Sequence, residues 1–144
     1  MQVKDRWTDA DFGQMGWHDC RIYSITLPDE DFSVRLDIDY LFHWQEQPNK
    51  QYKFWVSPCD LRFLNVSGFS ADLDYGNSTL LFISDLKRRN PRLSTNGETT
   101  VWEYEIDCNL GTIALAATSF EQVVRSQPKA SETQDLGRGL HAAV

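Results

Sequence analysis

Long apolar runs are missing from this 144-residue sequence. No stretch approaches the ~20 consecutive apolar residues that a helix needs to cross a bilayer, and residues 1–7 contain no apolar core of the signal-peptide kind. We therefore expect a cytoplasmic protein that makes no contact with a membrane. The length predicts one domain, because two domains of half this size would each bury little apolar surface.

Cysteine is also scarce. The three cysteines, Cys20, Cys59 and Cys108, are far apart in the sequence, and no Cys-x-x-Cys pair is present. A structural zinc site of the knuckle type is therefore not supported. An odd number of cysteines in a reducing compartment predicts three free thiols that pack as small apolar side chains.

The sequence lacks the short motifs that carry catalysis or bind a cofactor. It contains no glycine-rich phosphate loop, no Gly-x-Ser-x-Gly turn and no His-Glu-x-x-His pair. Cations are outnumbered, since 14 Lys and Arg stand against 21 Asp and Glu, a net charge of −7. That balance disfavours a nucleic-acid binder, because such affinity comes from clustered cations. We therefore expect no cofactor and no nucleic-acid partner, and we favour a protein that is not an enzyme.

What the sequence does contain is alternation of apolar and polar residues with a period of two. Every even position of residues 32–44 is apolar, and the odd positions are polar except for Leu41. Such a segment buries one face and exposes the other, which is typical of an antiparallel sheet. This alternation and the turn-forming residues between the alternating segments predict eight strands: 18–27, 32–44, 51–57, 61–66, 69–75, 79–86, 99–107 and 110–118.

The expected fold is mainly β: an antiparallel meander of about eight strands that forms a sandwich or a half-open barrel. One or two short helices are expected, near residues 8–12 and 120–124, where apolar residues follow helical spacing. Residues 87–98 are expected to form a basic loop. The domain is predicted to span residues 1–125, and the polar segment 126–144 to be a loosely held tail.

One candidate site follows from the expected register of the first hairpin. A hairpin that turns at residues 28–31 and keeps its apolar side chains on one face places Cys20 opposite Asp39. His18 and His43 then lie near them on the outer face, and imidazole, thiolate and carboxylate groups are ligands of divalent transition metals. The structural alternative is a solvated sheet face that happens to carry two histidines.

The other candidate site is a set of carboxylates on outward-facing strand positions. Because each acid alternates with a buried residue, each side chain is expected to point to solvent, where a negative patch would steer a basic partner. The alternative is that charged outer faces only keep the sheet soluble. The predicted contact residues are Asp37, Asp39, Asp72, Asp74, Glu103, Glu105 and Asp107.

Part of the chain resembles a known group of proteins. The strings Trp17-His18-Asp19 and Leu36-Asp37-Ile38-Asp39-Tyr40, followed by Trp44, are similar to those of small uncharacterised bacterial proteins. Some of these resemble the immunity proteins of polymorphic toxin systems, which are compact, acidic and cytoplasmic. The resemblance covers residues 17–66 and implies a protein that neutralises a toxin by binding it. It implies no catalytic residues.

The sequence thus favours a non-catalytic binding protein with a basic protein partner. Two alternatives stay open: a metal-dependent enzyme that uses His18, Asp39 and His43, with Cys20 as a further ligand, and a carrier of a small ligand in an aromatic-lined sheet interior. The oligomeric state is open, although an exposed edge strand would allow a homodimer.

Overall fold

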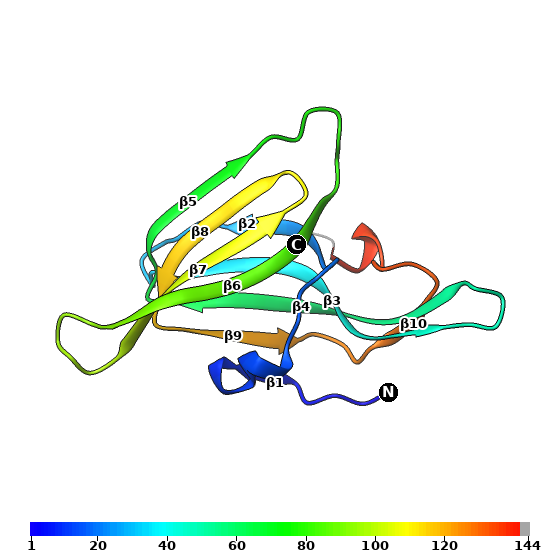
Figure 1. The fold of residues 1–144 in the computed structure, drawn as a ribbon, viewed down its shortest axis with the longest axis horizontal. Coiled ribbons are helices and arrows are strands. Elements are labelled where there is room, and N and C mark those ends of the chain that lie inside the picture. The colour runs from blue at the N-terminus through cyan, green and yellow to red at the C-terminus, as the bar shows by residue number, and fades with distance from the viewer. Residues whose placement is uncertain (142–144) are drawn as a thin grey trace.

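Two long strands, β3 (Val34–Glu46) and β4 (Tyr52–Leu64), form the central hairpin of the fold in the computed structural model (Figure 1). The structure describes residues 1–141. The other elements are β1 (Arg6–Thr8), η1 (Asp9–Gln14), β2 (Arg21–Thr26), β5 (Ser67–Leu73), β6 (Leu81–Leu93), β7 (Thr100–Cys108), β8 (Gly111–Ala117), β9 (Ser119–Val124), β10 (Lys129–Ser131) and η2 (Arg138–His141).

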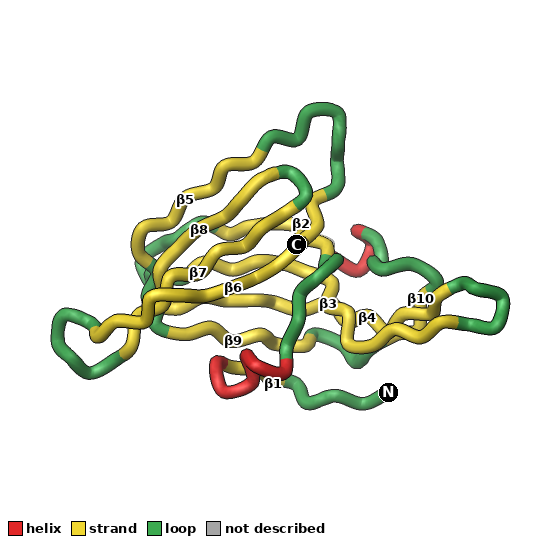
Figure 2. The backbone as a smooth tube through the Cα atoms, in the orientation of Figure 1, coloured by secondary structure: helices red, strands yellow, loops and turns green. Residues whose placement is uncertain are grey.

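The strands form one antiparallel sheet in the order β1-β9-β4-β3-β2-β6-β7-β8-β5, with β10 paired to β4. Strands β2 and β6 share only two residue pairs, Arg21 with Phe82 and Ile22 with Leu81. At this narrow joint the sheet folds back, so that the β6–β7–β8–β5 half lies over the β9–β4–β3–β2 half (Figures 1 and 2). The sheet does not close into a barrel. The predicted mainly antiparallel β fold is confirmed, with ten strands in residues 1–141 in place of the eight expected.

The core lies between the two halves of the sheet. The even-numbered apolar residues of β3 are buried from Val34 to Tyr40 and face it, as the alternation predicts. Strands β7 and β8 contribute from the other half, and the rings of Phe63 and Tyr104 meet across the core with centroids 5.0 Å apart. Apolar burial of this kind contributes roughly 1.5–3 kcal/mol for each large side chain.

The segment expected as a short helix at residues 120–124 is strand β9. Phe120 and Val124 satisfy a helical spacing, but together with Gln122 they also alternate with period two, and all three are buried. The segment pairs with β4 on one side and with β1 on the other, and these backbone hydrogen bonds favour the strand over the helix. The short helix expected near Thr8 is present as the 3-10 helix η1.

Two further expectations were wrong in detail. The segments 51–57 and 61–66 are one continuous strand, β4, with Pro58 inside it. The basic segment expected as a loop forms the second half of β6 as far as Leu93, because it pairs with β7. No helix in residues 1–141 has the length and hydropathy that a membrane span requires.

The C-terminal segment lies against the sheet, where we expected a loosely held tail. Its strand β10 pairs with β4, with Lys129 opposite Val56 and Ser131 opposite Phe54. The chain then runs over the outer face of β2 and β3 to η2, where His141 is buried. The last part of the expected tail, residues 142–144, lies outside the described residues.

Candidate functional site

The hairpin of β2 and β3 is paired in a different register from the expected one. Arg21 lies opposite Asp39, and Ser24 lies opposite Asp37. Between these pairs the register shifts, so that Tyr23 is an extra residue in β2. A bulge of this kind reverses the alternation of side chains along a strand.

The bulge exchanges the residues on the two faces of β2. Cys20 and Ile22 are buried in the core, whereas we expected them on the outer face. Tyr23, expected in the core, lies on the outer face together with Arg21. The guanidinium carbon of Arg21 is 4.3 Å from the centroid of the Tyr23 ring. The predicted pairing of Cys20 with Asp39 was therefore wrong.

A cluster of ionisable side chains forms on this outer face. We call it the carboxylate–imidazole cluster; its members are Tyr23, Asp37, Asp39, Arg125 and His141. The imidazole of His141 lies between the two aspartates of β3: Nδ1 is 2.6 Å from Asp37 Oδ1, and Nε2 is 2.6 Å from Asp39 Oδ1. Both ring nitrogens of His141 thus face a carboxylate, and Nδ1 also lies 2.9 Å from Arg125 Nη2.

Asp39 is fully buried and accepts three hydrogen bonds. Besides the bond from His141, its Oδ2 accepts from the hydroxyl of Tyr23 at 2.6 Å and from the backbone N–H of Leu136 at 2.7 Å. The ring of Tyr23 also stacks on the imidazole of His141, with centroids 3.7 Å apart and planes 12° apart. A buried carboxylate is tolerated only when it is paired and hydrogen-bonded in this way.

Arg125 completes the cluster from the end of β9. Its two terminal nitrogens lie 2.6 Å from Asp37 Oδ1 and 2.6 Å from Asp60 Oδ1. Asp60 is the β4 residue directly opposite Asp37, and these two like charges would repel without a cation between them. The carboxylates on this face are thus neutralised by residues of the C-terminal part of the chain.

The surroundings shift the protonation of these groups. Burial acts to lower the pKa of His141, but the hydrogen bonds and charges of Asp39 and Asp37 outweigh it and raise the pKa above its usual 6.5. Burial and the hydrogen bond to Asp39 raise the pKa of Tyr23, so the phenol stays neutral. Burial raises the pKa of Cys20 to about 12, which makes this thiol a poor nucleophile.

The four residues of the predicted metal site are not brought together. Cys20 lies in the core and Asp39 is held in the carboxylate–imidazole cluster. The side chain of His18 is 76% exposed, with Nδ1 2.8 Å from the carbonyl oxygen of Ser84. His43 lies beyond a bulge in β3, next to the ring of Trp55. Among residues 1–141, no three His, Cys, Asp or Glu side chains are arranged to hold a metal ion.

The predicted acidic residues do not form one surface. Strand β3, which carries Asp37 and Asp39, belongs to one half of the sheet, and β7 and β5 belong to the other, where β8 separates them. Asp39 is buried and Asp37 is paired, so the expectation that both point to solvent was wrong.

In the other half, two of the β7 acids share one cation. Lys87 of β6 lies 2.9 Å from Glu105 and 3.0 Å from Asp107. Glu103, Asp72 and Asp74 are exposed, as the alternation predicts. These three are the predicted contact residues that the fold leaves open to a partner.

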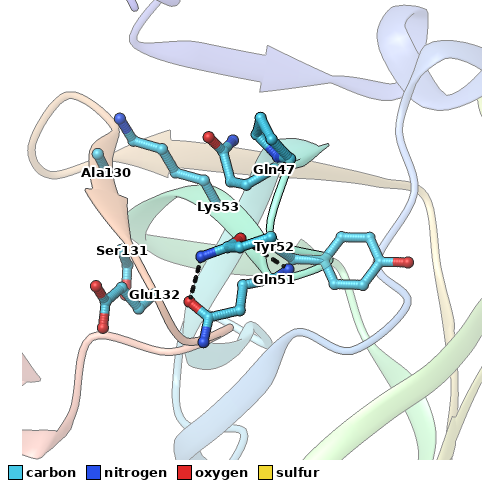
Figure 3. Close-up of a pocket in the computed structure, with 9 residues that line it drawn as sticks. Gln47, Gln51, Tyr52, Lys53, Ala130, Ser131 and Glu132 are labelled. Atoms are coloured by element: carbon cyan, nitrogen blue, oxygen red, sulfur yellow. Dashed lines mark hydrogen bonds between the residues drawn. The ribbon is translucent and has the colours of Figure 1, made fainter.

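A polar hollow of about 520 Å³ lies where β10 meets the hairpin of β3 and β4 (Figure 3). Gln47 and Lys53 line it from the hairpin, and Ser131 and Glu132 line it from the C-terminal segment. The ring of Tyr52 points away from these side chains. Amide side chains are the commonest polar groups in its lining, and Lys53 and Glu132 add one charge of each sign.

No family model, no curated protein and no solved structure matches this chain. The resemblance to immunity proteins therefore stays a prediction.

Proposed function

We propose that this protein is a non-catalytic binding protein whose partner is a basic protein. The groups that would supply chemistry are already occupied: the imidazole of His141 is held between two aspartates, and Cys20 is buried. The net charge of −7 favours a partner of the opposite sign.

The observation that carries the proposal is a pair of exposed aromatic side chains at the end of the central hairpin. We call residues 42–55 the hairpin arm. There β3 and β4 extend past the core (Figure 1), and Trp44 and Tyr52 are 60% and 45% exposed, with ring centroids 5.7 Å apart. Exposed aromatic pairs are unusual on a monomer's surface and are enriched at the centres of protein interfaces.

Acidic groups near and around the arm support the same partner class. Glu46 lies directly opposite Tyr52 at the end of the arm, and it is exposed. Asp72, Asp74 and Glu103 are exposed on the other half of the sheet. Such charges accelerate encounter with a basic protein and add little to the final affinity.

The immunity-type role, a cytoplasmic location in a bacterium and the toxin as partner belong to this proposal and come from the resemblance of residues 17–66. The two alternatives receive less support from the geometry. The metal-dependent enzyme needs His18, Asp39 and His43 in one site, and the carrier needs space in the sheet interior, which Phe63, Tyr104 and Phe120 fill.

The test is formation of a defined complex. The immobilised full chain is exposed to lysate of cells that express it, and any captured basic protein is purified and titrated back by calorimetry. We expect one-to-one binding that weakens as salt increases and that Trp44→Ala reduces by roughly ten-fold or more. The matched control is Leu93→Ala, which removes a similarly exposed apolar side chain elsewhere on the sheet. Recovery of no protein that rebinds in purified form contradicts the proposal.

A further inference from the structure

A groove of about 430 Å³ lies along the hairpin arm, and Tyr52 lines both this groove and the hollow of Figure 3. Trp44, Tyr52 and Phe54 line one wall, and these three share a face of the hairpin because Trp44 pairs directly with Phe54 and Tyr52 lies two residues away. The ring of Tyr52 turns away from Lys53 in Figure 3, and its centroid lies 5.7 Å from that of Trp44 and 6.2 Å from that of Phe54. The wall is therefore a continuous aromatic surface.

The opposite wall of the groove is polar and carries one carboxylate. His18, Asp19 and Gln134 line it, and the amide of Gln134 donates to Asp19 Oδ2 at 3.0 Å. No Lys or Arg lines the groove. Asp19 forms no ion pair with Lys or Arg within residues 1–141; Nε2 of His18 lies 3.4 Å from its Oδ2, and its side chain is 41% exposed.

The absence of a Lys or Arg partner distinguishes Asp19 from the paired acids of the sheet faces. Asp37, Asp60, Glu105 and Asp107 each lie within 3 Å of a Lys or Arg nitrogen. A carboxylate that lines the same groove as aromatic rings, with no Lys or Arg beside it, is electrostatically complementary to a positive ligand, since ring faces also attract cations.

The protein itself shows which cation fits such surroundings. The guanidinium carbon of Arg88 lies 4.2 Å from the ring centroids of both Phe12 and Trp102, and Nη1 donates to Asp9 at 3.1 Å. Aromatic faces and one carboxylate thus hold a guanidinium inside this fold. The groove provides the same components without the guanidinium.

A second internal example has the same composition. Arg21 lies 4.3 Å above the ring of Tyr23, and its Nη1 is 3.1 Å from Asp135. A planar guanidinium stacks on a ring while its edge donates to a carboxylate, which an ammonium does less well.

We propose that the groove formed by Trp44, Tyr52 and Phe54 on one side and Asp19 on the other receives the guanidinium of an arginine side chain from a basic protein partner. The guanidinium stacks on the aromatic wall and donates to the Asp19 carboxylate. The inference rests on the proposed function, because it names the group of the basic partner that enters this site.

The first test uses N-acetyl-arginine amide as a probe of the groove. Titration into the ¹⁵N-labelled full chain is followed by NMR. We expect saturable shifts of the Trp44 indole and of the Asp19 and Gln134 backbone signals, with roughly millimolar affinity for a single side chain. N-acetyl-citrulline amide, which has the same shape without the charge, is expected to cause no saturable shift. N-acetyl-lysine amide is expected to bind more weakly than the arginine probe.

Two variants with matched controls locate the binding. Tyr52→Ala and Asp19→Asn are each expected to weaken binding of the probe by roughly two- to five-fold. Asp19→Asn suits the backbone, because Asp19 has a φ of 66° and asparagine tolerates that region. The controls are Tyr75→Ala, since Tyr75 is 44% exposed at a distant turn, and Asp72→Asn; both are expected to leave the affinity unchanged.

Several outcomes would overturn the inference. They are the absence of saturable shifts, equal binding of the citrulline or lysine probe, equal weakening by the control variants, or saturable binding of methyl glucoside in place of the arginine probe. The failure of the proposed function is separate. A purified basic partner whose affinity is unaffected by Tyr52→Ala and Asp19→Asn overturns the groove assignment and leaves the function standing. Binding of the arginine probe without any protein partner contradicts the function.

Discussion

The outer faces of the two sheet halves carry the same kind of sequence pattern but handle their charge in different ways. On β3, Asp37 and Asp39 alternate with core residues, and both are covered by Arg125 and His141 from the end of the chain. On β7, Glu105 and Asp107 alternate with core residues in the same manner. They stay at the surface and share Lys87 of the neighbouring strand.

The difference shows that alternation identifies which residues leave the core, and not whether they reach solvent. A charge on an outer face is neutralised by the adjacent strand or by a segment from far along the chain. Only neutralisation by a distant segment removes the charge from water. The loss of one partner there lowers the free energy of unfolding by more than it does at the surface. The comparison can be tested by removing corresponding groups from the two faces.

Removal of the buried carboxylate should have the largest effect. Asp39→Ala removes from a buried site the carboxylate that pairs with His141 Nε2 and accepts from the hydroxyl of Tyr23. We expect a loss of about 3–5 kcal/mol in the free energy of unfolding, measured by urea denaturation. The matched variant on the other face, Asp107→Ala, is expected to leave the urea midpoint nearly unchanged, because that carboxylate is partly exposed. Equal losses for the two variants would contradict the difference between the faces.

Removal of the imidazole should cost less. His141→Ala removes one partner from Asp37 and one from Asp39. Asp37 keeps its ion pair with Arg125, and Asp39 keeps its hydrogen bond from Tyr23. We expect a loss of about 1–3 kcal/mol. His43→Ala, which changes an exposed histidine on the hairpin arm, serves as the control and should have no effect on the urea midpoint. A loss in the control as large as that in His141→Ala would show that the effect is not specific to the cluster.

The stability contributed by His141 should also depend on pH. The pKa of His141 is raised in the folded protein, so the folded state holds this proton more tightly than the unfolded state. The contribution is fully present below pH 6.5 and is lost as pH rises through the raised value. The groups that face the imidazole are Asp37, Asp39, Arg125 and Tyr23.

The measurement compares wild type with His141→Ala at a series of pH values from 6 upward. The difference between their free energies of unfolding should shrink as pH rises. A difference that grows with pH would mean that the imidazole is held in its neutral form.

The smallest effect is expected on the β6–β7 face. Lys87→Met removes the cation shared by Glu105 and Asp107, which lies at the surface where water and salt screen it. The urea midpoint should stay within experimental error of wild type at about 0.15 M salt. A clear loss of stability in Lys87→Met would show that ion pairs on the two faces contribute alike to the free energy of unfolding.

Much of the fold was predictable because it depends on local pattern. The alternation in residues 32–44 correctly assigns Val34, Leu36, Ile38 and Tyr40 to the core. It fails for Trp44, which is 60% exposed, because the bulge between Leu41 and His43 moves Trp44 to the face of β3 opposite that of Tyr40. The alternation does not mark where such a bulge reverses the faces of a strand.

The candidate site was less predictable because it depends on pairings between distant segments. One extra residue at Tyr23 exchanges the faces of β2, and nothing in residues 18–27 marks that position as a bulge. His141 lies 102 residues from Asp39, in a segment whose polar composition suggested a loose tail. A lone histidine in that segment was the only signal, and it has no spacing relation to β3.

The 102-residue separation of Asp39 and His141 also bears on how the protein is made. During synthesis on the ribosome, β3 emerges long before the residue that neutralises it. Until then Asp39 has to remain hydrated, so the layer above β2 and β3 cannot close. Completion of this face is therefore a late event, and a stalled or truncated nascent chain would present an open, negatively charged sheet to the chaperones around it.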